Sequence, residues 1–280
     1  MSNAPGPYET LILQVRQERE KNLLKTERGW LTLAGLFHLH EGENFFGSGV
    51  ENDIVLPTPA APALAGTFTV KDGAVSIQAE AGLPMLCNGS HLPAGALADD
   101  QAEAPDFLTI GKITLVAIRR GSQHYIRMWN TDNPARKEFT GLRFYPVNPD
   151  LRLSAEFTPY NPLLPIIITD VLGNEHEVPH IGYVTFQWGG QECRLQAIGD
   201  QKSLYFSFRD ATNGDTTYGG GRELEAGLPS GGVAHLDFNL AHNPPCAYTD
   251  FATCPLPPAE NTLPVRIEAG EMKYREHGSH

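Results

Sequence analysis

The sequence predicts a mainly β protein, with an N-terminal helix, a β-sandwich, and then a second antiparallel β sandwich or barrel. Two observations support this class. The 280 residues include 28 glycines and 22 prolines, and both residue types favour turns. Short alternating or apolar runs recur about every 8–12 residues between these turns, which is the spacing typical of sandwiches and barrels.

Residues 8–27 have helical periodicity that ends near Gly29. Apolar side chains recur mostly at i, i+3 and i+4 spacing and therefore share one face. They are Tyr8, Leu11, Ile12, Val15, Leu23 and Leu24. We expect this amphipathic helix to pack on a sheet, with a partner-binding helix as the alternative. The apolar residues 30–39 predict either a short buried strand or a helical turn.

Five strand-and-turn segments follow between residues 41 and 127, namely GENFFGS, ENDIVLP, TFTVKDGAVSIQ, LCNGSHL and FLTIGKITLVAIRRG. Their order resembles the forkhead-associated domain, which implies a forkhead-associated-like β-sandwich. That family holds phosphothreonine with an Arg and with a Ser followed by a His. Here Ser48, Pro62 and Ala65 stand at those positions. Because a dianionic phosphate needs charge-assisted donors, we expect phosphopeptide binding to be lost.

The Pro- and Asn-rich residues 130–150 mark a boundary, so we expect three parts: a helix and lead-in at 1–40, the sandwich at 41–130, and an antiparallel β domain at 131–280. Short runs after the boundary predict a meander closed into a sandwich or barrel. These runs are LRLSAEF, PIIITDVL, GYVTFQW, CRLQAI, SLYFSFRD, YGGGRELE, VAHLDFNL and PVRIEA.

Residues 235–273 contain five prolines between Pro244 and Pro258 and fit neither helix nor strand periodicity. Proline lacks the backbone donor and pushes the preceding residue to an extended conformation. Apolar residues such as Tyr248 and Phe251 argue against disorder. We therefore predict a stiff, ordered loop that crosses the fold and forms one wall of a pocket.

Four motifs resemble a bacterial family known only as a domain of unknown function. They are GWLTLAGLFHLHEGENFFGS (29–48), DNPARKEFTGLRFYP (132–146), TYGGGR (217–222) and LDFNLAHNPPCAYTDFATCPLPPAENTLPVRIEAGE (236–271). The resemblance covers most of the chain. It implies no activity.

Charge and hydropathy limit the partners. The formal net charge is −12 and the pI about 5.2, so phosphate backbones and anionic membranes would repel the protein. We expect no nucleic-acid or membrane partner, and the lack of a signal peptide predicts a cytoplasmic location. In that compartment Cys87, Cys193, Cys246 and Cys254 are expected to be reduced.

Several chemical motifs are present only in part. Residues 176–180 read HEVPH, but the zinc-binding form of H-E-x-x-H needs a helix, and Pro179 disfavours one. We expect a polar hairpin loop there. The glycines of 217–222 lack a following Lys-Ser or Lys-Thr, so they form no phosphate-binding loop. They are expected instead to permit a bulge or the close approach of another backbone, with the Pro-rich loop as the candidate for that backbone.

Two further hypotheses concern the C-terminal cysteines. A metal set would comprise His235, Asp237, His242, Cys246 and Cys254, all of which are zinc-ligand types. The cysteines lack C-x-x-C spacing, and we predict no cofactor. A nucleophilic Cys246 with His242 as its base is the other hypothesis.

Polar residues near the Pro-rich loop form the candidate binding site: Arg136, Tyr218, Arg222, Asp237, Asn239, Asn243, Glu260 and Asn261. The first hypothesis is a pocket in which Arg136 and Arg222 hold a small anionic molecule. The second is a hydrolase that uses Asp237 or Glu260 as a base. The third is a structural interaction module in which these residues tie down loop backbone. The sequence leaves open whether the protein is an enzyme.

Overall fold

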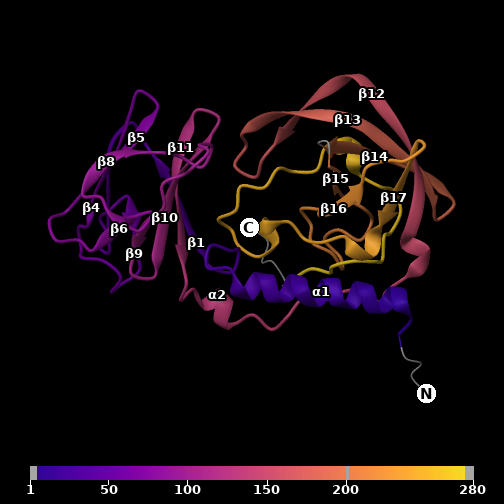
Figure 1. Ribbon diagram of the computed structural model, residues 1–280, viewed down its shortest axis with the longest axis horizontal. Coiled ribbons are helices and arrows are strands. Elements are labelled where there is room, and N and C mark those ends of the chain that lie inside the picture. The colour runs from indigo at the N-terminus through magenta and orange to yellow at the C-terminus, as the bar shows by residue number, and fades with distance from the viewer. Residues whose placement is uncertain (1–4, 200–201, 275–280) are drawn as a thin grey trace. The chain divides into compact units, whose positions relative to one another are not determined.

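The computed structural model describes residues 5–199 and 202–274, and it confirms the mainly β class (Figure 1). The chain divides into two compact units. The N-terminal unit comprises residues 23–139, and the C-terminal unit comprises residues 1–22 together with 140–280. The division at residue 140 lies within the Pro- and Asn-rich residues 130–150, and most of the N-terminal helix joins the C-terminal unit.

The N-terminal unit is a β-sandwich. One sheet has the order β1-β11-β10-β9-β6-β7 and the other β3-β2-β4-β5-β8. The strands are β1 (Leu33–Leu39), β2 (Gly42–Gly47), β3 (Ile54–Val55), β4 (Gly66–Lys71), β5 (Ala74–Ala79), β6 (Met85–Cys87), β7 (Ser90–His91), β8 (Ala94–Leu97), β9 (Leu108–Ile110), β10 (Ile113–Arg120) and β11 (Gln123–Asn130). Inward side chains of both sheets, among them Phe46, Phe68, Leu115 and Ile126, share one core. The short helix α2 (Pro134–Lys137) follows.

The C-terminal unit contains one curled six-stranded sheet. Its order is β16-β15-β14-β13-β12-β17, and the two edge strands β16 and β17 lie next to each other. The sheet therefore nearly closes into a barrel. The strands are β12 (Arg152–Thr169), β13 (Glu175–Trp188), β14 (Gln191–Gly199), β15 (Ser203–Phe208), β16 (Arg222–Gly227) and β17 (Val233–Asp237). The 3-10 turn η1 (Pro149–Leu151) leads into β12.

Three strand assignments need correction. The runs LRLSAEF and PIIITDVL are not two strands, because β12 continues through both with a register shift between Pro159 and Leu164. HEVPH is not a loop, because residues 176–180 lie within β13. PVRIEA forms no strand. In the first two cases pairing with a neighbouring strand overrides local turn signals, because the ladder supplies the backbone partners.

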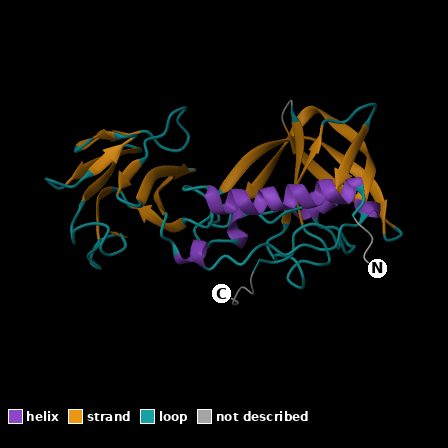
Figure 2. Ribbon diagram, turned by 60° about the horizontal axis from the view of Figure 1, so that its bottom comes forward, coloured by secondary structure: helices purple, strands orange, loops and turns teal. Residues whose placement is uncertain are grey.

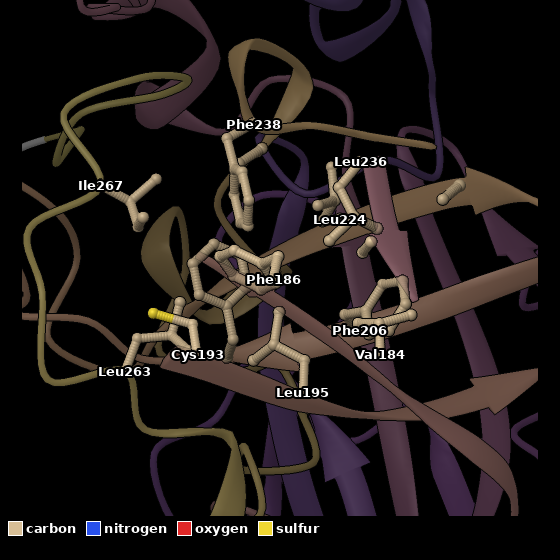
Figure 3. Packing of buried hydrophobic residues seen from close by; sticks show 14 of the residues in the cluster. Val184, Phe186, Cys193, Leu195, Phe206, Leu224, Leu236, Phe238, Leu263 and Ile267 are labelled. Carbon is tan, nitrogen blue, oxygen red and sulfur yellow. The ribbon is translucent and has the colours of Figure 1, made fainter. Parts of the chain in front are cut away.

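Residues 238–274 form what we call the C-terminal segment. It contains the 3-10 turns η2 (Phe238–Leu240), η3 (Pro245–Ala247) and η4 (Ala259–Asn261) and is otherwise irregular. The segment is ordered, as predicted, but it also fills the barrel. Leu263 and Ile267 join Phe186, Leu195 and Phe206 in the apolar core (Figure 3). Core packing of this kind stabilises by about 25 cal/mol per Å² of apolar surface removed from water.

Helix α1 (Pro7–Lys25) lies across the loops of the C-terminal unit (Figure 2). Its buried face differs from the predicted one: Ile12, Arg16 and Leu23 are buried, whereas Leu11 is 56% exposed. Val15 and Leu24 are exposed as well. The buried face includes an arginine because Arg16 donates to the carbonyls of Tyr145 and Asn239, at 2.8 and 3.3 Å. These hydrogen bonds thus set the rotation of α1, so the buried face differs from the face that apolar spacing predicted.

Candidate functional site

The asparagine at the end of η4 anchors the C-terminal segment to the barrel. Asn261 Oδ1 accepts from the Gln196 amide at 2.6 Å. Its Nδ2 donates to the carbonyls of Gln196 and Ser207 at 3.0 and 2.8 Å. Because the side chain is buried and these three bonds are all to backbone, Asn261 acts as a structural tie.

Arg222 begins β16 and is completely buried. Its Nη2 lies 2.7 Å from Asp210 Oδ2 and 2.9 Å from the Ile267 carbonyl oxygen, and Nη1 donates to the carbonyl of Ala269. These donors face protein groups. The structure therefore supports a network role for Arg222, with Asp210 as its ion-pair partner.

Asp237 and Asn239 join the end of β17 to helix α1. The Tyr8 hydroxyl lies 2.9 and 2.8 Å from the two carboxylate oxygens of Asp237. Asn239 Nδ2 donates to the Tyr8 oxygen at 3.0 Å and to the Asn148 carbonyl at 2.8 Å. Burial and the contact with Asp237 raise the pKa of Tyr8 to about 12. These contacts hold α1 on the unit.

Asn243 belongs to a second connection with α1. Its Nδ2 donates to Glu271 Oε1 at 2.9 Å and to the Met272 carbonyl at 2.8 Å. Arg19 of the helix forms an ion pair with Glu271 at 2.9 Å. The hydroxyl of Tyr248 also donates to this carboxylate. Glu271 is therefore held by three side chains, in agreement with its complete burial.

Two predicted site residues lie apart from these contacts. Arg136 belongs to α2 in the N-terminal unit, where Nη1 lies 3.4 Å from the Thr131 carbonyl. Glu260 is exposed. One glycine of the run lies against the C-terminal segment: a Cβ on Gly221, whose φ is +106°, would lie 2.6 Å from the side-chain atom Pro257 Cγ.

The remaining predicted residue, Tyr218, lies beside Cys246, and these two define the best candidate site. The Tyr218 hydroxyl donates to the Cys246 carbonyl oxygen at 3.3 Å. Cys254 Sγ accepts from the Cys246 amide at 3.2 Å. Cys246 and Tyr218 are only partly buried, whereas Cys254 is buried.

These contacts change the acidity of both thiols. Hydrogen bonds from Cys254 and Tyr218 lower the pKa of Cys246, although burial opposes the change. The hydrogen bond to Cys246 and burial raise the pKa of Cys254. The pair therefore favours a thiolate on Cys246 and a thiol on Cys254. The thiolate is the form that attacks electrophiles.

Acidic and phenolic groups surround the pair. Both thiols lie within the field of the Glu223 carboxylate, and Tyr205 hydrogen-bonds the same carboxylate. His242 is not placed as the base of Cys246. Its Nδ1 lies 3.2 Å from the Leu240 carbonyl and its Nε2 lies 3.5 Å from Glu223 Oε2. The residues that contact Cys246 are instead Tyr218 and Cys254.

The described residues contain no group of three or more His, Cys, Asp or Glu side chains arranged to hold a metal ion. In the HEVPH stretch, His176 Nε2 lies 3.0 Å from Asp170 Oδ2. His180, at the other end, is completely buried. On a strand the two histidines do not present the single helical face that zinc binding by this motif requires.

The sequence placed Cys246 and Cys254 together only in the metal hypothesis, and it did not join Tyr218 to them. Residues 247–253 separate the cysteines, and Tyr218 precedes them by a whole strand pair. The sequence feature that could have joined the three residues was the glycines and prolines that lie beside them.

Within residues 5–199 and 202–274, the helices fall short of the length and apolar character that a bilayer crossing requires. No curated protein is significantly similar to the chain. Among solved structures, an uncharacterized protein of Haloarcula marismortui is 33% identical, covers 51% of this chain and 81% of its own, and has a TM-score of 0.43.

Forkhead-associated domains are also similar. The FHA-2 domain of a Mycobacterium tuberculosis ABC transporter is 28% identical over 32% of this chain and 77% of its own, with a TM-score of 0.25. Because this TM-score is low, the forkhead-associated resemblance of residues 41–127 stays a prediction. Residues 137–272 match the model of one protein family, which is described as protein of unknown function (DUF1684).

Proposed function

We propose that the C-terminal unit binds a small molecule beside Cys246 and that the Cys246 thiol is the group that reacts with it. One observation carries the proposal. A partly buried cysteine contacts both Tyr218 and Cys254, and these two groups lower the pKa of its thiol and so favour the thiolate. Structural cysteines are typically buried and inert, whereas reactive ones combine partial exposure with a lowered pKa.

The surrounding charges argue for an uncharged or basic ligand. The anionic ligand predicted from the sequence depended on Arg136 and Arg222. Arg222 has no exposed side-chain surface, and Arg136 belongs to the other unit. The charges that act on the cluster are those of Glu223 and Asp250. The negative charges of Glu223 and Asp250 would repel an anion. In addition, neither carboxylate can donate a charge-assisted hydrogen bond to it.

The hydrolase hypothesis based on Asp237 or Glu260 gains less support. Both carboxylate oxygens of Asp237 accept from the Tyr8 hydroxyl, so a catalytic role would break a contact that holds α1. Glu260 is exposed, whereas catalytic groups typically lie in concave sites that exclude water.

The proposal is tested by alkylation of the full chain with iodoacetamide, with each cysteine followed by peptide mass spectrometry between pH 5 and 10. We expect Cys246 to react fastest at neutral pH, with a midpoint below the usual cysteine value of about 8.5. Cys87 is the matched control. It is also partly buried, but burial and a hydrogen bond to Asp106 raise its pKa to about 11.

The variant Tyr218→Phe removes one donor to the thiolate. A hydrogen bond to a charged group contributes about 1.5–3 kcal/mol, which corresponds to a rise of roughly one to two units in the Cys246 midpoint. A Cys246 that reacts no faster than Cys87 would contradict the proposal. A small-molecule thermal-shift screen on wild type and Cys246→Ser then identifies ligands that need the thiol.

A further inference from the structure

Cys246 and Cys254 are in contact. The Cys246 amide donates to Cys254 Sγ at 3.2 Å, and both are free thiols. A disulfide requires Cα atoms about 4.4–6.8 Å apart and closely approaching Cβ atoms. The contact between the Cys254 sulfur and the Cys246 backbone brings the two residues near enough for us to consider this bond.

The two thiols differ in access. Cys254 is only 5% exposed, whereas Cys246 is partly exposed. An oxidant from solvent therefore meets Cys246 first. The buried Cys254 sulfur contacts the Cys246 backbone amide. This is the arrangement of an attacking and a resolving cysteine.

We propose that Cys246 and Cys254 form a dithiol that reduces a hydroperoxide by two electrons and becomes a disulfide. The inference rests on the proposed function, because it needs a reactive thiol at Cys246. The substrate class is a small, uncharged hydroperoxide, which agrees with the acidic surroundings provided by Glu223 and Asp250.

The reaction balances in two steps. The Cys246 thiolate attacks one peroxide oxygen, so that the S–O bond forms and the O–O bond breaks. The departing alkoxide leaves as the alcohol after taking a proton from solvent, and Cys246 becomes a sulfenic acid. The Cys254 sulfur then attacks the Cys246 sulfur. The S–S bond forms, the S–O bond breaks, and the hydroxyl leaves with the Cys254 proton as water.

The pKa shifts of the two thiols agree with Cys246 as the attacking cysteine and Cys254 as the resolving cysteine. Cys246 has a lowered pKa because of its hydrogen bonds with Cys254 and Tyr218. Cys254 has a raised pKa because of its hydrogen bond with Cys246 and its burial. Attack by Cys246 removes the partner thiolate that raises the pKa of Cys254. The second thiol is thereby released for the resolving step.

The experiment treats the reduced full chain with hydrogen peroxide or tert-butyl hydroperoxide and follows intact mass and non-reduced peptide maps. Wild type is expected to lose two hydrogen atoms and to yield a linked peptide pair containing Cys246 and Cys254, which dithiothreitol reverses. Cys254→Ser is expected to stop at a Cys246 sulfenic acid that dimedone captures. Cys246→Ser is expected to lose the linked pair altogether. Cys193→Ser, at a buried cysteine of the barrel core, is the control that keeps it.

Two results would overturn the inference. One is oxidation of Cys246 to the sulfinic acid in wild type without any Cys246–Cys254 link. The other is a linked pair that forms equally fast between Cys246 and another cysteine. Iodoacetamide labelling separates the two proposals. Fast labelling of Cys246 without a disulfide would refute only the dithiol reaction, whereas slow labelling of Cys246 would refute the proposed function.

Discussion

Arg222 and Asp210 form an ion pair in the interior of the C-terminal unit, with 2.7 Å between Nη2 and Oδ2 and no exposed surface on either side chain. Asp210 Oδ1 also accepts from the Thr212 amide at 2.8 Å and from the Ile267 amide at 3.3 Å. The pair thus fixes the last part of the C-terminal segment to the start of β16. Removing one partner would leave the other charge buried and unpaired.

Arg222→Met is therefore expected to destabilise the C-terminal unit strongly. Loss of one member of a buried ion pair costs about 3–5 kcal/mol, which urea unfolding followed by circular dichroism would measure. Arg266→Met is the control, since Arg266 forms exposed ion pairs with Asp215 and Glu268, and we expect little change. Wild-type stability in Arg222→Met would show that the pair is not structural.

Asn261→Ala removes three hydrogen bonds to buried backbone groups of Gln196 and Ser207. At about 1 kcal/mol for each bond, we expect the free energy of unfolding to fall by roughly 3 kcal/mol. The neighbouring exposed residue supplies the control, Glu260→Gln, which should unfold like wild type. Equal stability of Asn261→Ala and Glu260→Gln would be incompatible with the anchoring role.

Tyr8→Phe removes the hydroxyl that donates to Asp237. We expect α1 to loosen, with a loss of about 1–2 kcal/mol and faster amide exchange in residues 8–22. Leu11→Ala, at an exposed position of the same helix, should leave exchange unchanged.

The pH dependence of stability gives a second test of the contact between Tyr8 and Asp237. The pKa of Tyr8 is raised to about 12 in the folded state by burial and Asp237, above the unfolded value of about 10. The contribution to stability is therefore complete below about pH 10 and is lost as pH rises toward the folded-state pKa. The difference in stability between wild type and Tyr8→Phe should shrink over that interval, and a constant difference would contradict the assignment.

Asp170 gives an acid-dependent prediction. Burial alone would raise the pKa of its carboxyl, but hydrogen bonds from His176 and Asn174 outweigh burial and lower it. Because the folded-state pKa lies below the unfolded value of about 3.9, this carboxylate stabilises the unit above about pH 4. The contribution is lost as pH falls through the folded-state pKa.

Asp170→Asn should therefore unfold at lower urea than wild type at pH 7. The two proteins should converge in acid. The measurement is a pair of urea titrations, at neutral and acidic pH. If the difference in stability between wild type and Asp170→Asn grew in acid, the pKa of Asp170 would not be lowered in the folded state.

The predicted strands and helix were mostly confirmed because they depend on local periodicity. Alternation along residues 66–79 marks β4 and β5, and the spacing of residues 8–27 marks α1. The ordered C-terminal segment was also predictable, since proline geometry acts locally. The rotation of α1 was not, because it is set by donors such as Arg16 that bind carbonyls more than a hundred positions away.

Residue types and their spacing were enough to predict which stretches favour strands, where the chain turns, and that the proline-rich segment is stiff. The side-chain partners emerged from the folded chain: Asp210 for Arg222, Tyr8 for Asp237, and Cys254 with Tyr218 for Cys246. Backbone preference acts over a few residues, whereas an ion pair or a cysteine contact joins residues that only the curling of the sheet brings together. That curling brings β16, the turn before it and the C-terminal segment together.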